Sequence, residues 1–118
     1  MSGVVLKRFE QPDEVRVFDQ GRFELVRFGS TVLGRASYEP GWKWSVHVGA
    51  KLGKTSCDVA HVGIVLAGRA TAAMDGGPII ELKAGDVFSI APGHDSWVVG
   101  DEPYISLHIL GAEDYTHK

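Results

Sequence analysis

The sequence predicts an all-β fold, and two observations carry that prediction. Fifteen glycines and five prolines interrupt the 118-residue chain at short intervals, so that no long helix fits between them. The segments that remain are short and rich in β-branched and aromatic residues, which favour strands. Because no helical pattern separates these segments, an antiparallel sandwich or closed barrel is expected rather than alternating strands and helices.

Turn signals separate the predicted strands in order along the chain. Strands are expected at residues 23–28, 31–38, 42–48, 57–66, 70–74, 79–82, 87–90, 97–99 and 104–110. The polar residues 49–56, which include two glycines, are expected to form a loop. The clearest turn is Asp75-Gly76-Gly77, because a tight hairpin needs residues that accept a positive φ. The first twenty residues suit an edge strand with a turn, or an arm exchanged between subunits.

The composition limits which binding partners and which cellular location are expected. The chain carries 12 Lys and Arg against 15 Asp and Glu, a formal charge of −3, and its cations are scattered, so no nucleic-acid partner is expected. No run of about 18 apolar residues occurs, so no membrane partner is expected. Cys57 is the single cysteine, which excludes an intrachain disulfide and favours a cytoplasmic location.

The second half of the chain resembles the small single-domain cupins of the cupin 2 conserved-barrel type. Val65-Leu66-Ala67-Gly68, Gly85-Asp86-Val87-Phe88 and Ala91-Pro92-Gly93 carry the resemblance, which spans roughly residues 36–110. It implies an antiparallel jelly-roll β-barrel. The barrel is expected at residues 31–112, with an N-terminal strand or arm at 1–30 packed on it and a C-terminal tail at 113–118.

The resemblance also implies a metal site at the family's first motif, which is Gly, five residues, His-x-His, three or four residues, Glu, six residues and Gly. Gly41 and His47 reproduce the first glycine and the first histidine, whereas Gly49 stands in the second histidine position. His61, six residues before Gly68, stands where the family has its glutamate.

A second alignment of this motif begins at Gly49 and needs no insertion. It places Thr55 and Cys57 in the two histidine positions and leaves His61 in the glutamate position. We prefer the first alignment because it retains a histidine, although the second spaces more regularly.

The family's second motif ends with a histidine where this chain has Ser96, and His94 lies two residues earlier. Positions two apart share a face of a strand, so His94 can substitute for the missing ligand. The resemblance therefore implies His47, His61 and His94 as ligands of a divalent metal, and such imidazole sites suit Zn, Ni, Fe or Cu.

Five further residues are expected to line a ligand pocket in the barrel. They are Trp42, Trp44, Cys57, Trp97 and His108. Cys57 lies four residues before His61, hence on the same face of a regular strand, and could add a thiolate. Flat aromatic walls are also what a small organic ligand needs.

Two functional hypotheses follow. The first is a metal-binding cupin that holds a small organic molecule, with the family's range implying a dioxygenase, an isomerase or a lyase. The alternative is a non-catalytic, metal-free cupin that binds a small ligand or acts as a sensor. A homodimer is expected in either case, because a strand face bearing Trp42 and Trp44 would otherwise expose a large apolar patch.

Overall fold

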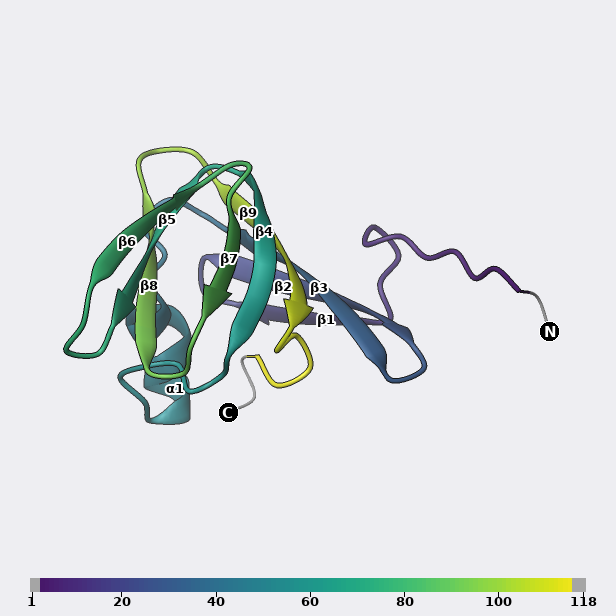
Figure 1. Ribbon diagram of the computed structural model, residues 1–118, viewed down its shortest axis with the longest axis horizontal. Helices are drawn as coiled ribbons and strands as arrows, with labels where there is room; N and C mark the ends of the chain where they lie inside the picture. The colour runs from purple at the N-terminus through teal and green to yellow at the C-terminus, as the bar shows by residue number, and fades with distance from the viewer. Residues whose placement is uncertain (1–2, 116–118) are drawn as a thin grey trace.

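The computed structural model describes residues 3–115 and shows two antiparallel β-sheets packed face to face as a jelly-roll barrel (Figure 1). The strands are β1 (Glu14–Phe18), β2 (Gly21–Phe28), β3 (Thr31–Tyr38), β4 (His61–Ala67), β5 (Arg69–Met74), β6 (Ile79–Lys83), β7 (Val87–Ile90), β8 (His94–Val99) and β9 (Tyr104–Leu110). The larger sheet has the order β1-β2-β3-β9-β4-β7 and the smaller one β6-β5-β8. The predicted all-β class is confirmed.

The hairpin predicted at Asp75-Gly76-Gly77 is confirmed as the connection between β5 and β6. The amide of Met74 donates to the carbonyl of Pro78 at 3.1 Å, and the amide of Gly77 donates to the carbonyl of Met74 at 3.0 Å. Gly76 has φ +64°, a conformation that glycine adopts without the steric cost of a side chain.

The strand predicted at residues 42–48 is wrong. Only its start keeps strand pairing, through a bridge between Lys43 and Trp97. The chain then turns into a π-helical segment η1 (Ser45–Gly49), followed by the short helix α1 (Ala50–Leu52). The helical conformation continues through Leu52, and so into residues 49–56, for which the sequence predicts a loop.

A distant carboxylate explains why this segment leaves the strand conformation. Asp95 accepts the backbone N–H of Ser45 at 3.0 Å and its hydroxyl at 2.8 Å. An N–H at the start of a helix has no partner within the helix, and a side-chain oxygen that accepts it stabilises the helix. Asp95 lies 50 residues away in sequence, so local periodicity carries no trace of this contact.

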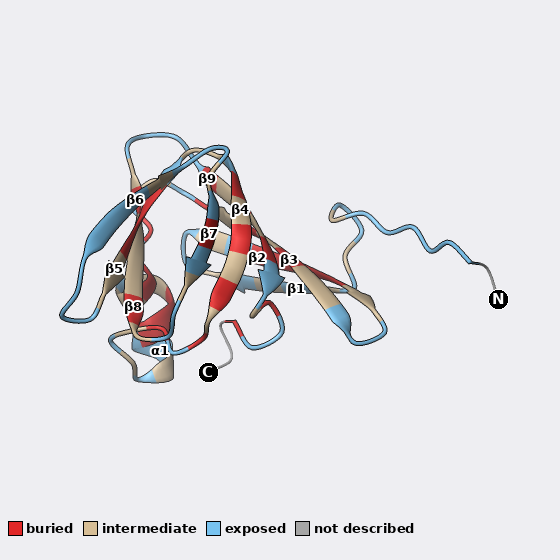
Figure 2. Ribbon diagram, viewed as in Figure 1, coloured by how far each residue is buried: buried red, intermediate tan, exposed pale blue. Residues whose placement is uncertain are grey.

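Aromatic side chains from the larger sheet and from the start of the helical segment form much of the core. The Tyr38 ring stacks on Trp42 with a centroid separation of 3.7 Å and faces Tyr104 at 5.8 Å. Trp42 and Trp44 are each 1% exposed, so the apolar patch that led us to expect a homodimer is absent. Figure 2 shows buried residues along the inward faces of the strands, while β6 is exposed along most of its length.

The N-terminal region contributes an edge strand. β1 pairs with β2, from Glu14 opposite Leu25 to Phe18 opposite Gly21, and the residues before it run away from the barrel (Figure 1). β2 continues the sheet of β3, and the division of the chain at residue 30 stays a prediction. Residues 1–2 and 116–118, the outer parts of the expected arm and tail, lie outside the described residues. Among residues 3–115, no helix is long and apolar enough to span a membrane.

Candidate metal centre

Cys57, His61 and His94 converge inside one end of the barrel. Cys57 precedes β4 and forms a bridge with His94 at the start of β8, with its amide donating to the His94 carbonyl at 2.6 Å. His61 begins β4 four residues after Cys57. The bridge between two segments far apart in sequence therefore brings the thiol next to both imidazoles.

The three side chains offer ligand atoms at distances that suit one metal ion. One atom from each, the sulfur or a ring nitrogen, lies within 4.8 Å of the other two, and all three residues are buried. Cys57 Sγ and His61 Nε2 are 3.5 Å apart. Two such atoms bound to one tetrahedral zinc would be roughly 3.6 Å apart, given the usual Zn–S and Zn–N distances. The residues present therefore fit a divalent ion.

A backbone carbonyl orients the His94 ring. Nδ1 of His94 lies 2.7 Å from the carbonyl oxygen of Ala91, and because a carbonyl only accepts, Nδ1 carries the proton. The lone pair is then on Nε2. Hydrogen bonds of this kind set the tautomer of metal-binding histidines and raise the basicity of the other nitrogen.

Burial keeps the imidazoles of this region neutral. Desolvation, with smaller contributions from His108 and His94, lowers the pKa of His61 to about 2. Desolvation likewise lowers the pKa of His108 to about 4 and raises that of the Cys57 thiol to about 11. Near neutral pH the site therefore presents uncharged nitrogen lone pairs, and a metal ion that binds Cys57 would displace the thiol proton.

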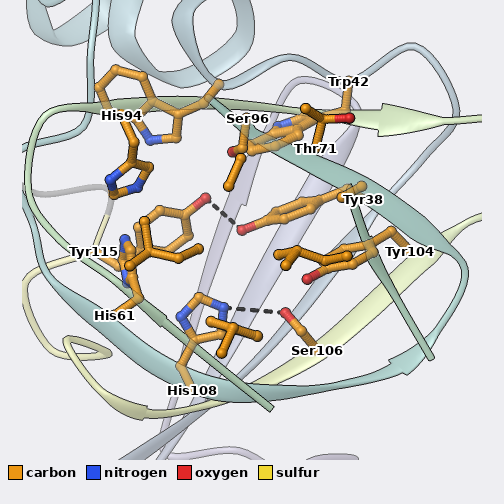
Figure 3. A pocket seen from close by; sticks show the side chains of 16 residues that line it. Tyr38, Trp42, His61, Thr71, His94, Ser96, Tyr104, Ser106, His108 and Tyr115 are labelled. Atoms are coloured by element: carbon orange, nitrogen blue, oxygen red, sulfur yellow. Dashed lines mark hydrogen bonds between the residues drawn. The ribbon is translucent and has the colours of Figure 1, made fainter. Parts of the chain in front are cut away.

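The two histidines face a small chamber between the sheets (Figure 3). Its cavity has a volume of about 40 Å³ and is lined by Tyr38, Trp42, Trp44, His61, Ala70, Thr71, Ala72, Leu82, Phe88, Ile90, His94, Ser96, Tyr104, Ser106, His108 and Tyr115. His61, His94 and Tyr115 lie on one side of the view, and Tyr38 and Tyr104 on the other. The hydroxyls of Tyr38 and Tyr115 form a hydrogen bond across it.

The segment after β9 places Tyr115 in the chamber. The Tyr115 ring meets His61 edge-on at 5.0 Å between centroids and lies 5.6 Å from His108. Arg16 of β1 donates to the carbonyl oxygens of Glu113 at 2.9 Å and Tyr115 at 2.7 Å. The cation thus holds the end of the described chain against the barrel.

Sequence reasoning missed the three chamber tyrosines. For Tyr104 a signal was available, because Tyr104, Ser106 and His108 alternate along β9 and so share one face. Tyr38 and Tyr115 carry no such pattern. Tyr38 and Tyr115 are 77 residues apart in the sequence, and their hydroxyls meet because the chain folds back after Gly111.

The structure brings some of the expected site residues together and leaves two apart. His61 and His94 lie beside Cys57, and His108, Trp42 and Trp44 line the adjoining chamber. His47 and Trp97 lie elsewhere.

His47 lies on the helical segment, where its Nδ1 is 2.9 Å from the backbone N–H of Lys43, and it faces a separate surface hollow with Arg16 and Lys51. Trp97 does not line the chamber, and Lys43 Nζ lies 5.3 Å from the centre of its ring. The position of Cys57 next to His61 follows the alignment that begins at Gly49, in which Cys57 takes a histidine position.

No protein-family model and no curated protein matches the sequence. Among solved structures, a cupin 2 conserved barrel domain protein of Salinispora arenicola is similar with a TM-score of 0.63 and 16% identity, over 91% of this chain and 87% of that one.

Two further cupins show the same likeness. A cupin-2 domain protein of Rhodospirillum rubrum matches with a TM-score of 0.59 and 19% identity, over 92% of this chain and 68% of that one. A cupin-like protein of Thermotoga maritima matches with a TM-score of 0.56 and 21% identity, over 80% of this chain and 71% of that one. With two sheets in jelly-roll order and these neighbours, the chain has the fold of a small cupin-type domain.

Proposed function

We propose that the protein binds one divalent first-row metal ion through Cys57, His61 and His94, next to a chamber that takes a small organic molecule. The observation that carries the proposal is the approach of the three buried ligand atoms to within 4.8 Å of one another. Nδ1 of His61 is also buried without a hydrogen-bond partner among the described residues, and unpaired buried polar atoms are rare in folded proteins.

The donor set limits the metals to those that accept both sulfur and nitrogen. One thiolate and two imidazoles suit Zn, Ni, Fe or Cu better than Mg or Ca, which prefer oxygen. Three protein ligands leave a coordination position for a small molecule, as in catalytic rather than structural zinc sites. When bound, the metal would supply Lewis-acid or redox chemistry, which the dioxygenases, isomerases and lyases of the cupin resemblance require.

The residues of the chain itself would prepare this site. The Ala91 carbonyl holds the His94 ring by accepting from Nδ1, and Tyr115 packs against the His61 ring. His108 is hydrogen-bonded to Ser106 at 3.2 Å and lies 5.1 Å from His61 between ring centroids. His108 thus remains beside the ligands as an uncharged polar group of the chamber wall.

Substitution of a ligand tests the proposal. Protein purified without an affinity tag and depleted of metal is titrated with Zn²⁺ and Co²⁺, and about one ion per chain is expected by elemental analysis. His61→Ala should weaken metal binding more than tenfold. Losing a group that only hydrogen-bonds a metal ligand already costs about 10- to 100-fold in affinity, and losing a ligand itself costs more. His47→Ala is the matched control, since His47 lies outside the cluster.

Two results would refute metal binding. If the parent binds none of Zn, Ni, Fe or Cu, or if His61→Ala binds as tightly as the parent, the metal hypothesis fails. Folding of the variant is checked by circular dichroism, so that lost binding is not confused with unfolding.

One observation favours the metal-free alternative. The 3.5 Å separation of Cys57 Sγ and His61 Nε2 also suits a hydrogen bond from the thiol to the imidazole, which would satisfy both groups in a ligand-binding or sensor domain. The Co²⁺ form distinguishes the two, because a thiolate ligand produces a sulfur-to-cobalt charge-transfer band in the near ultraviolet. Cys57→Ser should abolish that band if the metal proposal is right.

A further inference from the structure

Two buried N–H donors in the chamber wall have no acceptor. Trp42 and Trp44 are each 1% exposed, and their indole Nε1 atoms have no hydrogen-bond partner among the described residues. An indole N–H can only donate, so each of these groups needs an oxygen or another acceptor. Both residues line the chamber that His61 and His94 face.

Four polar side chains of the chamber wall are paired with one another. The hydroxyls of Tyr38 and Tyr115 form a hydrogen bond, and the Ser106 hydroxyl pairs with His108 at 3.2 Å. Figure 3 shows Trp42 beside Thr71 and Ser96, and its ring stacks on that of Tyr38, yet its Nε1 has no hydrogen-bond partner among the described residues. The indole groups therefore point to an acceptor that a ligand brings.

Charge balance favours an anion as that acceptor. None of the residues that line the chamber is an Asp, Glu, Lys or Arg. A divalent ion bound by one thiolate and two neutral imidazoles carries a single net positive charge, which is costly in a buried site. A monoanion neutralises it, whereas a neutral ligand leaves it and a dianion overshoots it.

The size of the chamber restricts the anionic group. A cavity of about 40 Å³ is large enough for roughly two to four water-sized groups, which is the size of a carboxylate with one further carbon. A larger cleft of about 450 Å³ lies next to it between β6 and β7, and Ala72, Leu82, Phe88 and Ile90 line both. The other residues of the cleft are Met74, Pro78, Ile80, Val87, Ser89 and Ala91, of which only Ser89 is polar.

We propose that the ligand is a monocarboxylate, with its carboxylate in the chamber as acceptor for the Trp42 and Trp44 N–H groups and an apolar remainder along the β6–β7 cleft. The proposal deepens the proposed function and rests on it, because the metal supplies the positive charge that the anion balances.

The Co²⁺ form separates failure of this proposal from failure of metal binding. The visible spectrum before any ligand is added reports whether cobalt occupies the site. Acetate, butyrate and pentanoate are then titrated, with butanol and chloride as controls. We expect the carboxylates to alter the cobalt bands, and each buried methylene to tighten binding roughly fourfold.

Three outcomes would overturn the monocarboxylate proposal while metal binding stands. The first is a cobalt spectrum that the carboxylates leave unchanged at millimolar concentration. The second is an equal response to butanol or to chloride. The third is an affinity that does not rise from acetate to pentanoate. Absence of the cobalt spectrum itself would instead refute the proposed function.

The indole groups are tested directly by NMR of the Zn²⁺ form. The chain has three tryptophans, and single Trp→Phe variants assign their indole ¹H–¹⁵N signals. Butyrate should shift the Trp42 and Trp44 signals downfield and leave Trp97, which lies off the chamber, unchanged. Shifts confined to Trp97, or no shifts, would overturn the assignment of the two donors.

Affinity measurements on the same variants complete the test. Trp42→Phe and Trp44→Phe keep an aromatic ring but lose the N–H, and each should weaken butyrate binding roughly tenfold, as expected for a hydrogen bond to a charged group. Trp97→Phe is the matched control. Zinc stoichiometry and circular dichroism confirm that each variant is folded. Parent-like butyrate affinity in both chamber variants would contradict the proposal.

Discussion

At the scale of single residues, close backbone approaches decide which positions accept a side chain. A Cβ at Gly63 in β4 would lie 2.0 Å from the carbonyl oxygen of Leu107 in β9 and 2.8 Å from the Phe88 ring. The β4–β9 pairing shifts register between Val62 and Gly63, which allows the two backbones to come this close. Gly63 is thus required by the pairing rather than by a turn.

Gly63→Ala should therefore destabilise the fold by about 2–3 kcal/mol, because a backbone oxygen cannot move aside without breaking the ladder. Urea unfolding followed by tryptophan fluorescence measures the change. Gly3→Ala is the control, since a Cβ at Gly3 meets nothing within 4 Å. Equal stability of the two variants would mean that β4 and β9 are less tightly paired than the structure shows.

At the scale of elements, the contact between Asp95 and Ser45 determines the conformation of η1. Asp95 also lies 3.7 Å from Lys43 Nζ, so its carboxylate connects the start of the helical segment to β8. We expect Asp95→Ala to cost about 1–2 kcal/mol, the usual loss for a helix cap. Faster hydrogen exchange at the Ser45 amide would identify the cause, and Asp101→Ala, in an exposed turn, is the control. Unchanged exchange would count against the capping role.

The contacts of Glu14 with Arg16 and Arg27 make the stability of the fold depend on pH. Hydrogen bonds from Arg16 and Arg27 lower the pKa of Glu14 in β1 from 4.5 to about 2. The folded state therefore favours the ionised carboxylate, and this stabilisation is complete above pH 4.5 and is lost as the pH falls toward 2.

Glu14→Gln should lower stability at pH 7 by about 1 kcal/mol, a value reduced for solvent screening of a carboxylate whose side chain is 32% exposed. The difference from the parent should shrink as the pH is lowered below 4.5. Urea unfolding across that range measures it. If the stability difference between the variant and the parent stays constant with pH, the charge of Glu14 does not contribute to stability.

At the scale of the whole molecule, the homodimer stays a prediction, and an exposed isoleucine, rather than the tryptophans, now supports it. The tryptophans are buried, yet Ile79, at the start of the edge strand β6 and outside the lining of the β6–β7 cleft, is 68% exposed. An exposed apolar side chain on an edge strand favours burial against a second copy.

Light scattering should give twice the mass of one chain at micromolar concentration. Ile79→Asp should shift the protein toward the monomer, whereas Val46→Asp, at an exposed residue of the helical segment, should leave the dimer intact. A monomer mass for the parent would refute the prediction.

The sequence alone determined the all-β class, the hairpin at Asp75-Gly76-Gly77 and the strands at 31–38, 87–90 and 104–110, whose bounds match β3, β7 and β9. These features follow from local causes, since glycine conformations and β-branched runs act within a few residues. Cupin motif spacing likewise pointed to His47, His61 and His94 as ligands and offered Cys57 as a thiolate donor. The structure places Cys57, His61 and His94 together and leaves His47 outside that cluster.

Only the tertiary structure decided which donors meet. Asp95 caps the helical segment that carries His47 outside the cluster, while the bridge from Cys57 to His94 brings the thiol to the imidazoles. The chain beyond β9 then placed Tyr115 in the chamber. Each of these contacts joins segments that are distant in sequence, and their energies arise from burial and hydrogen bonds that exist only once the sheets have packed.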